Sequence, residues 1–61
     1  MVDFCIYTPN DKDYWGQVTN KEFFEMLDKE FPGWEIDPKA SNDARAHYKK
    51  NDALIVAQFS R

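Results

Sequence analysis

Cysteine, histidine and glycine are scarce in this chain, which has one cysteine, one histidine and two glycines among 61 residues. A lone cysteine cannot form a disulfide within the chain, which fits a reducing compartment better than secretion. Cys5 and His47 alone cannot supply the ligands of a structural zinc site, and two isolated glycines do not make a phosphate-binding loop. We therefore expect no metal and no cofactor.

Long apolar runs are also missing. No stretch approaches the roughly 18 apolar residues of a membrane helix, and residues 1–3 lack the basic region that opens a signal peptide. Acidic residues outnumber lysine and arginine by eleven to eight, giving a net charge of -3. This charge disfavours general attraction to phosphate backbones. Because neither a membrane span nor a signal peptide is predicted, we expect a soluble, cytoplasmic protein with no membrane partner.

The chain is rich in apolar and aromatic residues, at 43% and 16%, which is too much for a disordered protein. Its length allows one domain, residues 1–61, and a domain this small buries only about 60% of the surface that its unfolded chain exposes. The core is therefore marginal, and a homodimer that adds burial is one expectation.

Alternating apolar and polar residues predict several strands. The first covers residues 2–8 and is followed by turn residues at 8–11. Residues 14–18 are rich in strand formers, although Gly16 weakens this second strand or marks a bulge. Residues 53–59 are the strongest strand pattern and contain a continuous apolar run at 53–57, which is typical of a central strand.

A helix is predicted from Thr19 onward, because Thr19 and Glu22 have the spacing of a capping box. An apolar stripe at helical spacing follows, and Pro32-Gly33 ends the helix. The stripe consists of Phe23, Phe24, Leu27 and Phe31, with Met26 on its flank.

The last third of the chain has two interpretations. Residues 34–37 alternate as a short strand, and residues 44–49 alternate before a turn at Asn51-Asp52, which predicts a hairpin with residues 53–59. Alternatively, residues 41–48 form a short helix capped by Ser41 or Asp43. The hairpin gives an α+β fold of order β(β)αβββ, a small antiparallel sheet of three to five strands with one amphipathic helix packed on one face.

No catalytic constellation is evident. Cys5 and His47 are the one conceivable nucleophile and base, but Cys5 falls within a strand pattern, where a free cysteine is usually a small buried apolar residue. We therefore predict that the protein is not an enzyme, and look instead for binding surfaces.

Two surfaces are candidates for partner binding. The first is an acidic face of the helix, which could dock on a basic patch of another protein. Its residues are Glu22, Glu25 and Asp28. The rival is the sheet face and hairpin, where aromatic and basic residues of the kinds enriched at interfaces occur. Its residues are Tyr7, Tyr14, Trp15, Arg45, Tyr48 and Lys49.

These features favour a small acidic accessory factor that acts by binding another protein. Such a factor is of the kind that phages and mobile elements encode to inhibit or modulate a larger host protein. The alternative is a module that binds single-stranded nucleic acid, with bases stacked on sheet aromatics and phosphates held by the basic hairpin.

Overall fold

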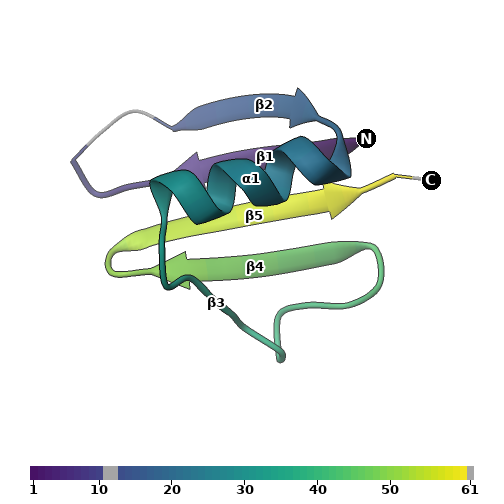
Figure 1. The fold of residues 1–61 in the computed structure, drawn as a ribbon. Coiled ribbons are helices and arrows are strands. Elements are labelled where there is room, and N and C mark those ends of the chain that lie inside the picture. Colours follow the sequence, from purple (N-terminus) through teal and green to yellow (C-terminus); the bar gives the residue numbers. More distant parts are fainter. Residues whose placement is uncertain (11–12, 61) are drawn as a thin grey trace.

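Five strands and one helix make up the fold in a computed structural model, which describes residues 1–10 and 13–60 (Figure 1). In chain order they are β1 (Val2–Tyr7), β2 (Tyr14–Val18), α1 (Asn20–Glu30), β3 (Glu35–Ile36), β4 (Arg45–Lys50) and β5 (Ala53–Phe59). The sheet is antiparallel throughout, with strand order β2-β1-β5-β4-β3. The predicted α+β fold is confirmed, and so is the central position of residues 53–59.

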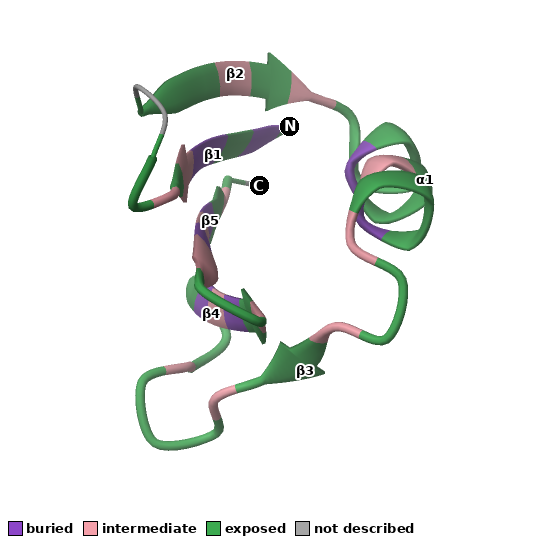
Figure 2. Cartoon of the chain, turned by 90° about the vertical axis from the view of Figure 1, so that its left-hand side faces the viewer, coloured by how far each residue is buried: buried purple, intermediate pink, exposed green. Residues whose placement is uncertain are grey.

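The molecule has two layers, because α1 lies across one face of the sheet and no described element covers the other face (Figure 2). Phe23 and Leu27 are fully buried on the inner side of the helix, where they meet Val2 and Ile55 from the sheet. No helix in the described part of the chain is long and apolar enough to cross a membrane.

Aromatic rings supply much of the core. The ring of Phe23 lies 5.7 Å from the rings of both Phe4 and Tyr48 and 6.1 Å from that of Phe59, measured between ring centroids. Each ring removes a large apolar area from water, and tilted or edge-to-face contacts of this kind add to that stabilisation. One helix residue thereby joins three strands of the sheet.

Both predicted ends of the helix are confirmed. The Thr19 hydroxyl accepts from the Glu22 backbone N–H at 3.2 Å, and the Thr19 backbone N–H donates to the Glu22 carboxylate at 3.2 Å, which completes the capping box. At the other end, Gly33 has a φ of 84°, a left-handed conformation that glycine adopts without steric cost.

The hairpin is confirmed, and the alternative of a short helix over 41–48 is wrong. The Asn42 side-chain oxygen accepts hydrogen bonds from the backbone N–H groups of Ala44 and Arg45. These bonds stabilise a turn that leads into β4 rather than into a helix. Asn51 closes the hairpin with a φ of 53°. The strand expected at 34–37 is shorter in the structure, where β3 covers only Glu35–Ile36. A turn was also expected at residues 8–11, and its last residue, Asp11, lies outside the described residues.

Replacing Thr19 with alanine should lower the free energy of unfolding by about 0.5–2 kcal/mol near neutral pH, because the first helical turn loses its capping oxygen. Hydrogen bonds from Thr19 also hold the pKa of the Glu22 carboxyl below its usual value. A carboxyl whose pKa is lowered by folding stabilises the fold above its unfolded pKa, and this contribution disappears as pH falls through the folded pKa.

Urea unfolding at a series of pH values checks this prediction. The difference between the wild type and Thr19→Ala should narrow as the pH drops below the ordinary range of a glutamate carboxyl. A difference that stays constant down to full protonation would show that the hydrogen bond from the Thr19 hydroxyl to the Glu22 carboxylate contributes nothing to the cap.

Candidate functional site

The sheet face opposite α1 is formed by every second residue of each strand. Phe4 points toward the helix, so its neighbours Asp3 and Cys5 point the other way. We call this surface the open face; its residues follow from the strand register. Asp3 aligns with Gln17, Gln58 and Arg45; Cys5 with Trp15, Val56 and His47; and Tyr7 with Leu54 and Lys49.

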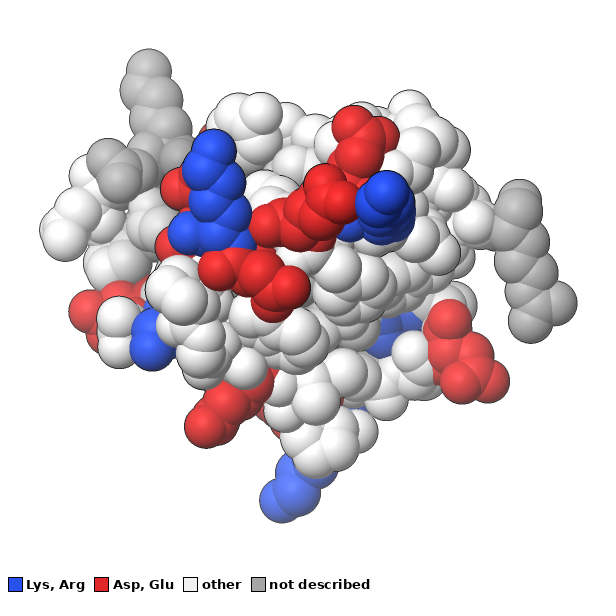
Figure 3. All heavy atoms as spheres, in the orientation of Figure 1, with Lys and Arg blue, Asp and Glu red and all other residues white. Residues whose placement is uncertain are grey.

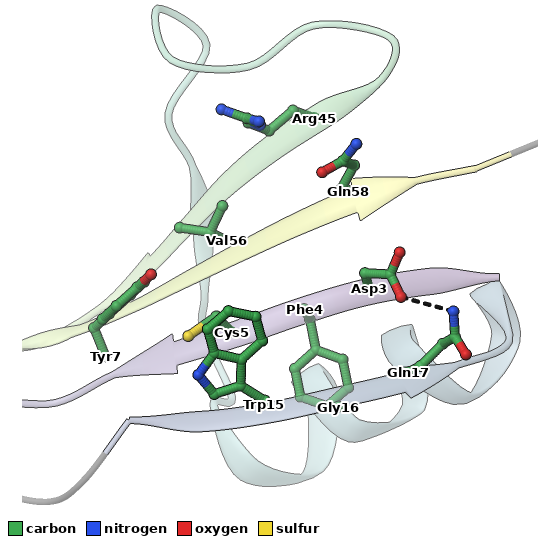
Figure 4. Close-up of a pocket in the computed structure, with 10 residues that line it drawn as sticks. All are labelled: Asp3, Phe4, Cys5, Tyr7, Trp15, Gly16, Gln17, Arg45, Val56 and Gln58. Atoms are coloured by element: carbon green, nitrogen blue, oxygen red, sulfur yellow. Dashed lines mark hydrogen bonds between the residues drawn. The ribbon is translucent and has the colours of Figure 1, made fainter.

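A shallow hollow lies in the middle of the open face (Figure 4). Cys5 and Val56 form its floor, and Trp15 and Tyr7 stand beside it. Trp15 is 77% exposed, which is unusual for the largest apolar side chain in a small soluble domain. An apolar floor beside an exposed ring is the composition expected of an interface rather than of a solvated sheet surface.

Polar groups surround the hollow on the remaining sides. The Gln17 side-chain amide donates to the Asp3 carboxylate at 2.7 Å, so this end of the hollow is fixed by a hydrogen bond across β1 and β2 (Figure 4). Arg45 and Gln58 stand across the sheet from them. Within residues 1–10 and 13–60, Arg45 forms no ion pair, so its charge is available to a partner.

Tyr7 and Cys5 lie on the same side of β1, two residues apart. A hydrogen bond between their side chains, together with the negative charge that the thiol would carry if ionised, raises the pKa of the Tyr7 phenol. A tyrosine phenol is neutral at physiological pH, so Tyr7 can donate a hydrogen bond to a bound group.

Cys5 and His47 share one row of the open face, but Val56 separates them. Two strand spacings place their backbones about 10 Å apart, which is too far for a thiol and an imidazole that stand side by side to exchange a proton. The described residues also contain no group of three or more His, Cys, Asp or Glu side chains that could hold a metal ion.

The structure divides the predicted sheet-face residues between the two sides of the sheet. Tyr7, Trp15, Arg45 and Lys49 lie on the open face. Tyr48 does not; it is 4% exposed and packs edge-on against Trp34, with 5.0 Å between ring centroids. Our grouping of Tyr48 with the exposed rings is wrong, because it alternates with Lys49 and His47 and so points toward the helix.

Tyr14 is also on the helix side, since it is paired with Ile6 and its ring lies 5.9 Å from that of Phe4. It is nevertheless 60% exposed, because β2 is an edge strand that α1 covers only in part. Tyr14 is therefore a rim residue of the core and does not line the hollow.

The three acidic residues predicted as the binding face of α1 are each engaged within the chain. The Glu22 carboxylate belongs to the capping box, and Glu25 lies 4.0 Å from Lys21. Asp28 accepts a hydrogen bond from the Trp34 indole N–H at 2.9 Å. Figure 3 shows lysines mixed with the acidic side chains on this side of the molecule, so the helix surface is not uniformly negative.

Seven residues of the hollow are absent from the sequence-based candidates for partner binding: Asp3, Phe4, Cys5, Gly16, Gln17, Val56 and Gln58. The signal that could have found Asp3 and Cys5 is their spacing, because residues two and four positions from Tyr7 share its face of the strand. Gln17 follows from Trp15 in the same way. Val56 requires the pairing of β1 with β5, which local spacing does not reveal.

Comparisons with known proteins give no match to this chain, whether with protein-family models, with curated proteins or with solved structures. The case for a function therefore depends on the geometry of the open face.

Proposed function

We propose that this protein is a small accessory factor that binds another protein through its open face. The observation that supports this most is the exposed Trp15 ring beside an apolar floor, on the one sheet face that no described element covers. Tryptophan and arginine are the residue types that most often dominate binding energy at interfaces. Trp15 and Arg45 occupy opposite sides of one hollow.

The hollow suits a partner that offers an apolar side chain next to a carboxylate. The apolar group would cover Cys5 and Val56 and contact Trp15, while the carboxylate would pair with the guanidinium of Arg45. Arginine matches a carboxylate with two parallel hydrogen bonds, so this pairing would fix the orientation of the partner as well as attract it. A protein bound in this way would be inhibited or modulated wherever the contacted segment is functional.

The acidic face of α1 is the weaker of the two surfaces. Glu22 and Asp28 already accept hydrogen bonds that hold the helix cap and the Trp34 ring. A partner that recruited these carboxylates would compete with contacts that stabilise the fold. Glu25, whose only described partner is the exposed Lys21, can be changed at little cost and serves as the test of that surface.

A capture experiment with matched variants tests the proposal. Tagged wild-type protein, Trp15→Ala, Arg45→Glu and Glu25→Lys would be incubated with source-cell lysate, and the bound proteins quantified. We expect one stoichiometric partner whose binding falls at least about tenfold with Trp15→Ala and with Arg45→Glu, because truncating a central interface anchor typically costs about 2 kcal/mol or more. Glu25→Lys should retain it.

The reverse pattern contradicts the proposal. If Glu25→Lys loses the partner while Trp15→Ala and Arg45→Glu keep it, the acidic helix is the binding surface. Circular dichroism of each variant is the control for folding, and all three positions are exposed enough that the spectra should match.

Single-stranded nucleic acid is the second candidate ligand. Arg45, His47 and Lys49 follow one another along the open side of β4, and Trp15 offers a ring for stacking. Against it, Asp37 already pairs with Lys49 at 3.3 Å, and Asp3 lies on the same face. Fluorescence anisotropy with mixed oligonucleotides at about 50 mM salt, where phosphate contacts are strong, decides the matter; absence of binding there excludes this candidate.

A further inference from the structure

The two edges of the sheet differ in how well they are protected. At one edge, β3 has two residues, is followed by Pro38, which has no N–H, and is flanked by the Asp37–Lys49 ion pair. At the other edge, β2 has five residues and contains no charged residue and no proline. Natural proteins usually shield edge strands with charges, proline or short length, and β2 has none of these devices.

The backbone groups that β2 leaves free can be identified from the register. The Ser60 N–H donates to the Met1 carbonyl at 3.1 Å, so β1 directs the backbone groups of its odd-numbered residues toward β5. Its even-numbered residues therefore bond to β2, where Phe4 is opposite Gly16. It follows that Trp15 and Gln17 direct their N–H and C=O groups away from the sheet.

We propose that two copies of the chain associate through this edge, with β2 of one protomer antiparallel to β2 of the other and the twofold axis at Gly16. In this register Trp15 faces Gln17 of the partner subunit, and each such pair exchanges both of its backbone hydrogen bonds. The two sheets become one continuous sheet, with both helices on one side and both open faces on the other.

A second copy fits this edge because the edge is complementary to itself. Trp15 and Gln17 are placed symmetrically about Gly16, as an isologous interface requires. No charged residue lies between Tyr14 and Val18, so two chains of net charge -3 can meet here without opposing like charges. The pairing also places Tyr14 beside Val18 of the partner subunit, which covers a ring that is 60% exposed in the protomer.

Gln17→Pro tests this interface with little damage to the protomer. Proline removes the outward N–H of Gln17, which has no acceptor within the sheet, and proline is tolerated on the free side of an edge strand. Gln17→Ala is the matched control, since both variants lose the hydrogen bond to Asp3 but the alanine keeps its N–H. Sedimentation equilibrium over a wide concentration range gives the dissociation constant of each.

We expect the wild type to reach twice its 7.2 kDa mass as concentration rises. Gln17→Pro should raise the dissociation constant about tenfold or more, because the symmetric interface loses a donor from each copy, and Gln17→Ala should change it no more than a few-fold. Hydrogen exchange gives a second readout on the unmodified chain. The Trp15 and Gln17 amides should exchange fast in dilute solution and slowly at high concentration, while the Gly16 amide stays protected in both.

A wild-type mass of 7.2 kDa at every concentration overturns the proposal, as does a dimer that Gln17→Pro leaves intact or fast exchange of both amides at high concentration. The dimer and the proposed protein binding can fail separately. Arg45 is on β4, three strands along from β2, so Arg45→Glu tests partner binding without touching this edge.

Discussion

Replacing Phe23 with alanine should lower the free energy of unfolding by about 3–5 kcal/mol, the range found for large aromatic residues removed from cores. Phe23 is fully buried, and its ring is within 6.1 Å of three rings that come from β1, β4 and β5. Its removal leaves a cavity between the helix and the sheet, which the surrounding close-packed residues can fill only in part. No other residue of α1 connects as many strands through ring contacts while being fully buried.

The size of this effect matters because the whole domain has little stability to lose. At roughly 0.05–0.15 kcal/mol per residue, a chain of this length has a total of about 3–9 kcal/mol. Phe23→Ala should therefore be largely unfolded at room temperature or unfold at very low urea concentration, as measured by circular dichroism and tryptophan fluorescence.

Phe24→Ala is the matched control for this variant. It removes the same side chain from the next position of the helix, but Phe24 is 36% exposed, so the cost should be clearly smaller. Equal destabilisation by both substitutions would mean that the two rings act as one cluster and that burial does not determine their contribution.

A side chain at Gly16 should be the second most disruptive change, since the Phe4 ring lies directly over this glycine. A Cβ at position 16 would be 2.6 Å from Cε1 of Phe4 and closer still to Cζ. The ring cannot turn aside, because it is buried between Phe23 and Tyr14. Gly16→Ala should therefore cost about 1–3 kcal/mol, the usual penalty of overpacking.

The sign of this effect is diagnostic. In a strand where nothing approaches the glycine, alanine is favoured over glycine by about 0.5–1 kcal/mol, so Gly16→Ala would stabilise the protein. Urea unfolding of the wild type, Gly16→Ala, Phe4→Leu and the double variant, all at low protein concentration, measures the coupling between the two sites. The cost of Gly16→Ala should shrink when leucine replaces Phe4; an unchanged cost would locate the strain in the backbone.

The elements of this fold were predictable because their signals are local. The capping box needs only Thr19 and Glu22, and the strand patterns need only the alternation of neighbouring residues. The hairpin was harder, since residues 41–48 contain alanines that suit a helix as well as a strand. Ala46 and Tyr48 are buried as strand residues beneath α1, where the Tyr48 ring meets that of Phe23, and such a contact is distant in sequence.

The candidate site was predictable only in part, for a similar reason. Composition identified Trp15 and Arg45 as interface residue types, but composition does not state which side of the sheet a residue occupies. Tyr48 is an example. It is next to Lys49 on one strand, so the two side chains must point to opposite faces, yet the prediction assigned both to the same binding surface. Gly16 shows a different limit: the ring that lies over it belongs to Phe4 on the neighbouring strand, and this contact cannot be identified from the residues next to Gly16 in sequence.

The Ser60–Met1 hydrogen bond has a consequence for how the protein is made. It marks the pairing of β1 with β5, so the first and last strands of the chain are neighbours at the centre of the sheet. Such a pairing must close nearly the whole chain as one loop, which slows folding relative to local hairpins. A nascent chain that still lacks β5 cannot assemble the sheet, so this domain acquires its structure only once β5 has been synthesised.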